Sequence, residues 1–242
     1  MAAIETVRLT KRYKDVIAVN ELDLKIESGE LFSLLGMNGA GKTTAIKMLS
    51  CLTKPDSGQA FVEGFSVVED ASEVKRRIGV SPQETAIAPN LSVKENLELM
   101  CGIHGLSGQE TLETILELSR RFGLESISSK KAGKLSGGWQ RKLSIAMALV
   151  SRPSVLFLDE PTLGLDVIAR RELWDAVRSL KGKVTVILTT HYMEEAEALS
   201  DRIGILKDGK LLVVGTVPEL LERTGADRFE SAFISFVKEE TL

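Results

Sequence analysis

Residues 31–44 read LFSLLGMNGAGKTT, an apolar run that leads directly into a glycine-rich loop. The loop meets the pattern G-x-x-x-x-G-K-[ST] with Gly36, Gly41, Lys42 and Thr43. In this pattern the glycines let backbone N–H groups turn inward around phosphate oxygens, the lysine reaches the β and γ phosphates, and the threonine ligates Mg²⁺. The alternative is a glycine-rich turn without a ligand. The strand-like run before the loop and the helical pattern after it favour a nucleotide site, because the helix would point its positive end at the same anion.

Composition and charge limit the classes of protein that this chain resembles. It has 242 residues, 43% of them hydrophobic and 27% charged, which is an ordinary globular balance. The net charge of −3 gives no basic excess, so no nucleic-acid partner is expected from bulk electrostatics. No apolar run approaches the roughly 18–20 residues that span a bilayer, and the first residues lack the apolar centre of a signal peptide. We therefore expect a soluble, cytosolic protein that only a partner could hold at a membrane.

Two cysteines and the order of the apolar runs add to this prediction. Cys51 and Cys101 have no metal-site spacing and are interpreted as buried free thiols. Strand-like runs lie at 4–9, 22–26, 31–35, 59–63, 77–80, 155–158, 184–188, 203–206 and 210–214. The stretch from about 91 to 150 instead has helical spacing, and a helix near 168–180 separates two apolar strands. The pattern predicts an α/β fold with a mixed sheet, N-terminal antiparallel strands and a helical insertion.

Two carboxylates follow the apolar run Val155–Leu158. Ligands of open α/β sheets bind at the carboxyl ends of the strands, where the glycine-rich loop also lies. Asp159 is therefore expected to hold the hydration shell of Mg²⁺, and Glu160 to orient and deprotonate an attacking water. A strand end with two solvated acids is the alternative, which the upstream loop disfavours.

A second helix start has the chemistry of an anion site. Ser136, Gly137 and Gly138 precede a helical pattern that runs to Val150, so a hydroxyl and free N–H groups would lie at a helix N-terminus. Ser-Gly-Gly is a common helix start, and its position just before the acidic strand is what gives it weight.

Four stretches carry a family resemblance: in order, they are Gly36 to Thr44, Leu135 to Gln140, Val155 to Glu160 and His191. With them the chain resembles, over nearly its whole length, the nucleotide-binding subunit of an ATP-binding cassette (ABC) transporter. The resemblance implies a P-loop NTPase core and one domain over residues 1–242. Its parts would be a RecA-like core with antiparallel strands at 1–84 and 151–217, a helical subdomain at 85–150 and a C-terminal helical segment at 218–242.

The resemblance also assigns roles to single residues. Tyr13 resembles the aromatic residue that stacks on adenine, and Gln83 the glutamine that senses magnesium and couples to the membrane subunit. His191 resembles the histidine at the γ-phosphate, whose alternative is a polar cap at a strand end, and residues 164–166 resemble the loop that crosses to a partner subunit. The implied catalytic residues are Glu160, His191 and Gln83, and the implied metal ligands are Thr43, Gln83 and Asp159. The implied nucleotide-binding residues are Tyr13, Gly36, Asn38, Gly39, Ala40, Gly41, Lys42, Thr43, Thr44, Ser136, Gly137 and Gly138.

Three positions depart from the family pattern, and none removes a group needed for hydrolysis. Met37 stands where proline is commonest, Trp139 replaces the glutamine that usually follows Ser-Gly-Gly, and Leu163 stands where serine is frequent. Residues 192–197 and the end of the chain resemble the half-size ATPases of ABC-2 export systems.

The resemblance implies an ATPase with ATP and Mg²⁺ that powers transport, most readily export, through a separate integral membrane permease. It implies a homodimer or heterodimer of ATPase subunits, peripheral on the cytoplasmic face of the cell membrane. The alternative is a non-transport ABC ATPase that acts on a ribosome or a nucleic-acid partner. Such chains usually carry two cassettes, a long coiled-coil insertion or metal clusters.

Overall fold

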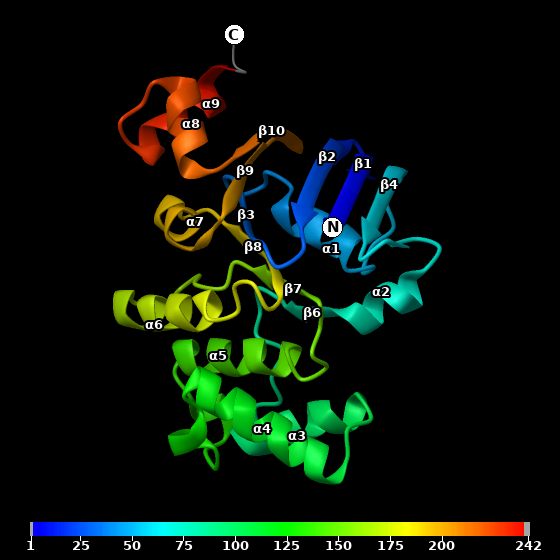
Figure 1. Cartoon of the computed structure of the whole chain (residues 1–242), viewed down its shortest axis with the longest axis vertical. Coiled ribbons are helices and arrows are strands. Elements are labelled where there is room, and N and C mark those ends of the chain that lie inside the picture. Colours follow the sequence, from blue (N-terminus) through cyan, green and yellow to red (C-terminus); the bar gives the residue numbers. More distant parts are fainter. Residues whose placement is uncertain (1, 240–242) are drawn as a thin grey trace.

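Two β-sheets and a set of helices make up the computed structural model, which describes residues 2–239 (Figure 1). The smaller sheet has four antiparallel strands in the order β2-β1-β4-β5. Their bounds are β1 Ala2–Tyr13, β2 Val16–Glu27, β4 Ser57–Val62 and β5 Phe65–Ser66. The predicted antiparallel strands at the N-terminus are therefore confirmed.

Both N-terminal strands are longer than the runs 4–9 and 22–26 that alternation marked. Their pairing shifts register at several points, including the interval between Thr6 and Leu9, where Arg8 has a positive φ of 45°. Each shift breaks the two-residue alternation of inward and outward side chains. The alternating pattern therefore marks the central part of each strand and misses the irregular remainder.

The larger sheet has six strands in the order β10-β9-β3-β8-β7-β6. Strands β9, β3, β8, β7 and β6 are parallel to one another, and the edge strand β10 pairs antiparallel with β9. The bounds are β3 Leu31–Leu35, β6 Ile78–Ser81, β7 Val155–Asp159, β8 Thr185–Thr190, β9 Arg202–Lys207 and β10 Lys210–Gly215. This is the mixed sheet that the sequence predicts, and the parallel strands end together at one edge.

The helices cover both faces of this sheet. On one side α1 and the antiparallel sheet pack on it, and on the other side lie α5 and α6 (Figure 1). The helices are α1 Lys42–Leu49, α2 Ala71–Arg77, α3 Val93–Ile103, α4 Gly108–Phe122, α5 Gly137–Ala148, α6 Val167–Arg178, α7 Met193–Leu199, α8 Val217–Thr224 and α9 Phe229–Glu239, with short 3₁₀ turns at Glu125–Ile127 and Ala132–Lys134.

Strand β7 explains why its sequence is apolar without alternation. Val155 and Phe157 belong to the core shared with the antiparallel sheet and α1, whereas Leu156 and Leu158 belong to the core shared with the helices. All four side chains are fully buried. A strand buried on both faces reads as a continuous apolar run, which is what makes it recognisable as a central strand.

The helical stretch from α3 to α5 packs below the sheet in the view of Figure 1. Val93 and Leu97 face its core, whereas Leu99, Leu112 and Leu116 are about half exposed. The helical spacing predicted for this stretch is confirmed, since all five residues lie in α3 or α4. The boundaries of the helical subdomain at residues 85 and 150 stay a prediction.

The C-terminal segment forms α8 and α9, which pack against α7, β9 and β10. Phe229 is buried in this small core, and Phe233 and Phe236 pack against it, as expected of a packed terminal helix. Of the predicted segment 218–242, residues 240–242 lie outside the described part of the chain. Cys101 is buried as predicted, whereas Cys51 is only partly so; both are free thiols.

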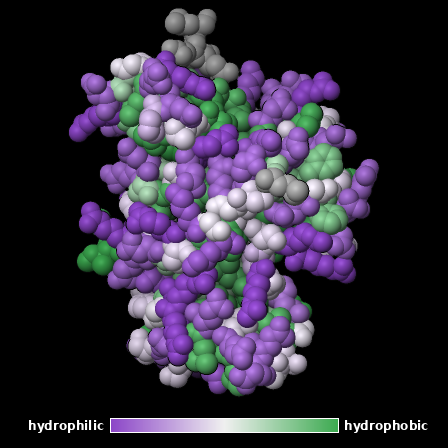
Figure 2. All heavy atoms as spheres, viewed as in Figure 1, coloured by the Kyte–Doolittle hydropathy of each residue, from purple (hydrophilic) through white to green (hydrophobic). Residues whose placement is uncertain are grey.

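Much of the surface is hydrophilic on the face drawn in Figure 2, with apolar residues in small groups between hydrophilic ones. Among the helices of residues 2–239, none has both the length and the apolar character needed to cross a bilayer.

Candidate nucleotide site

The glycine-rich loop joins β3 to α1, and its glycines are required by close backbone approaches. Gly41 has a φ of 103°, and a Cβ added to it would lie 2.2 Å from the carbonyl oxygen of Ala18. A Cβ on Gly36 would lie 2.4 Å from the carbonyl oxygen of Leu206. Any larger residue at either position would displace β2 or β9 from the loop.

A cavity of about 420 Å³ lies over this loop. It is walled by the loop, by the start of α1 and by groups from the ends of the central strands. The lining residues are Ala18, Asn38, Gly39, Ala40, Gly41, Lys42, Thr43, Thr44, Gln83, Glu160, Leu163 and His191. Ten of these were candidate site residues in the sequence, and the fold brings them to one place from four separate segments of the chain.

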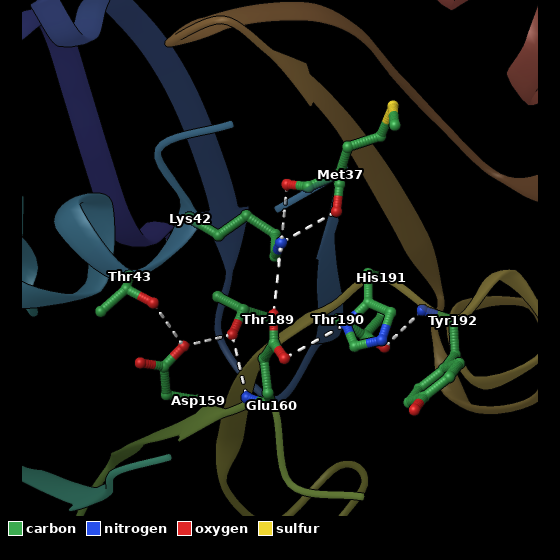
Figure 3. A network of polar contacts seen from close by, with 10 residues as sticks. Met37, Lys42, Thr43, Asp159, Glu160, Thr189, Thr190, His191 and Tyr192 are labelled. Atoms are coloured by element: carbon green, nitrogen blue, oxygen red, sulfur yellow. Dashed lines mark hydrogen bonds and ion pairs between the residues drawn. The ribbon is translucent and has the colours of Figure 1, made fainter. Parts of the chain in front are cut away.

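Lys42, Glu160 and His191 form a connected polar group at the cavity (Figure 3). The Lys42 Nζ donates to the carbonyl oxygens of Gly36 at 2.8 Å and Met37 at 3.1 Å, and lies 3.4 Å from Glu160 Oε1. Glu160 Oε2 lies 3.1 Å from His191 Nδ1. Lys42 and Glu160 are both more than nine-tenths buried, so their attraction is screened far less than that of a surface pair.

The backbone of Glu160 adopts a conformation that non-glycine residues rarely occupy, with a φ of 46°. Its N–H donates to Thr189 at the carbonyl oxygen, 3.1 Å away, and at Oγ1, 3.0 Å away. These two bonds to β8 hold the backbone turn at Glu160 in place, and the turn directs the carboxylate into the cavity. Strained backbone of this kind is concentrated at functional sites.

Asp159 lies beside this group and has two hydroxyl partners (Figure 3). Its Oδ1 accepts from Thr189 Oγ1 at 2.6 Å and from Thr43 Oγ1 at 3.1 Å. A carboxylate and a threonine hydroxyl at the edge of a phosphate loop are the hard oxygen ligands that Mg²⁺ prefers. The donor set therefore fits the metal that the sequence predicts.

The segment Ser136–Gly138 does not line this cavity. It begins α5 and lies against the loop 163–166 and the start of α6: a Cβ on Gly137 would touch Leu165 at 3.7 Å, and one on Gly138 would lie 3.0 Å from Ala169. Ser136 and Gly137 are exposed, so the N-terminus of α5 is open to a ligand from outside the chain. The two predicted phosphate-binding helix starts thus belong to separate surfaces of one molecule.

Tyr13 lies at the end of β1 and is 45% exposed, outside the residues that line the cavity. The hairpin that it closes returns along β2, which supplies Ala18 to the cavity wall. The Lys11 Nζ lies 5.5 Å from the Tyr13 ring centroid and 2.9 Å from Asp56 Oδ1. Tyr13 is thus a half-exposed aromatic ring on the hairpin that supplies Ala18 to the cavity, and its adenine role stays a prediction.

Trp139 is directed into the protein. It packs against the helical core, and the Lys142 Nζ lies 4.6 Å from its ring centroid while also pairing with Glu172 Oε2 at 2.7 Å. Gln140 donates to the carbonyl oxygens of Ala132 and Leu135. Trp139, which stands where the family pattern has glutamine, therefore holds the start of α5 against the helical core.

Sequence reasoning missed three parts of the site. Ala18 and Leu163 line the cavity, and Thr189 joins Asp159 to the backbone of Glu160. Thr189 had a signal: it is the penultimate residue of a buried parallel strand, two residues before His191, and parallel strands present their ends at one edge.

The family model described as ABC transporter matches residues 19–163. The chain belongs to the ABC transporter family. It is an ATP-binding ATPase of that family, as the sequence predicts, and its P-loop NTPase fold is confirmed.

Curated relatives carry names from drug resistance and export. The chain is 44% identical to the daunorubicin resistance ATP-binding protein DrrA3 of Streptomyces coeruleorubidus over 221 residues, 91% of this chain and 70% of that one. It is 42% identical to the Nod factor export ATP-binding protein I of Burkholderia thailandensis, over 95% of this chain and 76% of that one. These names agree with the ABC-2 export type.

A solved structure shows the same fold in a dimer. The dimeric post-hydrolysis structure of the ATP-binding cassette MJ0796 with ADP and Pi has a TM-score of 0.78 at 30% identity, covering 88% of this chain and 98% of that one.

Proposed function

We propose that this ABC ATPase hydrolyses ATP in a dimer and powers export through a separate membrane permease. The observation that carries the proposal is the cavity at the carboxyl edge of the sheet, where Lys42, Glu160 and His191 lie in contact with one another. The names of DrrA3 and the Nod factor export protein support the direction of transport.

The chemistry follows from the groups around the cavity. The loop N–H groups and Lys42 would bind the β and γ phosphates. Glu160 would accept the proton of the attacking water, and His191, in contact with Glu160, would hold the γ-phosphate. Thr43, Asp159 and Gln83 would hold Mg²⁺, which supplies charge neutralisation at the phosphates when bound.

A head-to-tail dimer would complete each site. Ser136 and Gly137 are exposed, and the segment Ser136–Gly138 does not line the cavity of its own chain, so it would close the cavity of a second copy. Val167 and Ile168 are exposed apolar side chains that directly precede Ala169, the residue that a Cβ on Gly138 would approach, and Ile168 is 72% exposed. The dimeric MJ0796 cassette supports this arrangement. Light scattering of Glu160→Gln with ATP should show a dimer, and ATP hydrolysis by the wild type should have a Hill coefficient above one. A monomer with hyperbolic kinetics would refute the dimer.

The permease would dock on the helical stretch that follows Gln83. Leu99 and Ile103 lie four residues apart on α3, on one face, and are 46% and 66% exposed. Glu95, although exposed, is a poor choice for a test because it forms a capping box with Ser92 at the start of α3. Changing Glu95 would weaken the helix as well as the surface.

The decisive experiment is affinity purification from native membranes. The wild type should recover a multi-span permease, and the double variant Leu99→Glu with Ile103→Glu should lose it while remaining folded by circular dichroism. Val68→Glu is the matched control, because Val68 is a similarly exposed apolar residue after β5, outside the helical stretch. Recovery of ribosomes or DNA in the soluble fraction, without a permease, would support the non-transport alternative. A permease would also place the chain at the cytoplasmic face of the membrane.

A further inference from the structure

Arg141 connects the helix of the Ser136–Gly138 segment to the main chain of Gln83. It lies in the second turn of α5, and its side chain is 5% exposed. Its Nη1 donates to the carbonyl oxygen of Pro82 at 2.6 Å, and its Nη2 donates to that of Gln83 at 2.5 Å. The planar guanidinium thus holds two successive carbonyl groups, a geometry that a lysine cannot reproduce.

Burying this cation is costly, so the contact needs compensation. Burial lowers the pKa of the Arg141 guanidinium, and the carboxylates of Asp159 and Glu195 act in the opposite direction by favouring its charge. Charge-assisted hydrogen bonds to two carbonyls offset the remaining desolvation. Arg141 therefore lies between the acidic edge of the sheet and the segment that carries Gln83.

Two more contacts fix α5 along β6. The Ser144 Oγ lies 2.9 Å from the Ser81 Oγ, and both residues are buried. A Cβ on Gly79 would lie only 2.2 Å from the carbonyl oxygen of Ala148, so the helix and the strand approach as closely as glycine allows. Ala148 and Ser144 of α5 thus contact Gly79 and Ser81 of β6, and Arg141, one turn earlier on the helix, contacts Pro82 and Gln83 just beyond the strand.

We infer that Arg141 is a positioning residue that fixes Gln83 relative to the start of α5, so that the Gln83 loop and the Ser136–Gly138 segment move together. The inference rests on the proposed function of the cavity, since Gln83 lines it. A shift of Gln83 at the phosphate end would then be passed through Arg141 to α5, which carries the segment offered to the second copy.

A double-mutant cycle tests this. Gln83→Ala removes the side chain but leaves the carbonyl that Arg141 holds, so Arg141 then has no side chain to position. We expect Arg141→Met to lower kcat about 10- to 100-fold, as misplaced catalytic groups do, while the KM for ATP changes less than about threefold. In the Gln83→Ala background the same change should have almost no further effect on kcat. Arg141→Lys, which keeps the charge but loses the fork, should be intermediate.

The matched control is Arg178→Met. Arg178 also donates to a main-chain carbonyl, that of Ala198, and pairs with Asp175, away from the cavity. The Arg178→Met variant should hydrolyse ATP at the wild-type rate. The inference would be overturned if Arg141→Met hydrolysed ATP at the wild-type rate. It would also be overturned if Arg141→Met lowered kcat by the same factor in the Gln83→Ala background as in the wild type. If Arg141→Met does not fold, Arg141→Lys decides by the same cycle.

Hydrogen exchange separates this inference from the proposed function. Arg141→Lys should accelerate amide exchange in segment 82–85, whereas Arg178→Lys should not, and neither measurement needs hydrolysis. A wild-type chain without ATPase activity would overturn the proposed function, and unchanged exchange in Arg141→Lys would then overturn the positioning role on its own.

Discussion

Replacing Glu160 by glutamine should strengthen ATP binding and slow ATP hydrolysis. The substitution keeps the shape of the side chain and a partner for His191, but it removes the negative charge 3.4 Å from the Lys42 Nζ. Hydrolysis should fall by about 10²- to 10⁴-fold, the contribution of a positioned general base. Binding should become tighter, for a reason that the geometry supplies.

Lys42 is attracted to Glu160, and a bound phosphate would compete for the same positive charge. At 3.4 Å and an effective dielectric constant of 20, the attraction between Lys42 and Glu160 has a ceiling of about 5 kcal/mol. Glu160 also repels the γ-phosphate. Removing its charge should free part of this energy for ATP, and tenfold tighter binding requires only about 1.4 kcal/mol of it. We therefore expect at least tenfold higher affinity together with the loss of turnover.

The assay compares equilibrium binding of ATP by calorimetry with single-turnover hydrolysis of γ-labelled ATP. Glu197→Gln is the matched control: it lies on the exposed side of α7 and changes the net charge by the same amount. It should leave both quantities unchanged. A Glu160→Gln variant that hydrolyses ATP at the wild-type rate would refute the assignment of the base, and weakened ATP binding would refute the electrostatic argument.

Four further changes test other parts of the molecule. Lys42→Ala should weaken ATP binding at least tenfold by calorimetry, because a charge-assisted contact to phosphate is lost. Tyr13→Ala should weaken ATP and GTP alike by about 1–3 kcal/mol while Tyr13→Phe binds normally, and equal affinities would place the base elsewhere. Asp159→Asn should raise the Mg²⁺ concentration needed for half-maximal hydrolysis, which a magnesium titration measures. Burial raises the pKa of Glu195, which accepts from Trp174 Nε1 at 3.0 Å. The folded state therefore binds the proton more tightly, and stability should fall as the pH rises above about 4.5; urea unfolding at several pH values should show this slope in the wild type and lose it in Glu195→Gln.

The central sheet and its loop were predictable because their physical requirements leave plain marks in the sequence. A strand buried on both faces is apolar throughout, as β7 is, and the close approaches at Gly36 and Gly41 admit only glycine. The site candidates from this region gather at one cavity for the same reason: parallel strands end at a common edge.

The sequence predicts features of the surface less well. Leu99 and Leu112 have helical spacing yet lie half exposed, because apolar residues on an outer face have the same period as those on an inner one. The bulges that lengthen β1 and β2 break the alternation on which strand recognition depends. Both limits arise where the pattern reports only one strand or helix and the outcome depends on what packs against it.

Arg141 and Thr189 show a different limit. Each acts mainly through main-chain atoms of another segment: Arg141 binds the carbonyls of Pro82 and Gln83, and Thr189 binds the N–H of Glu160. Every residue has a carbonyl and every residue except proline has an N–H, so no residue type on the partner side records the contact. What such residues contact is known only once the fold places them. They are also the residues through which nucleotide contacts at one segment would be transmitted to another, because a bond to the main chain moves the whole segment and not one side chain.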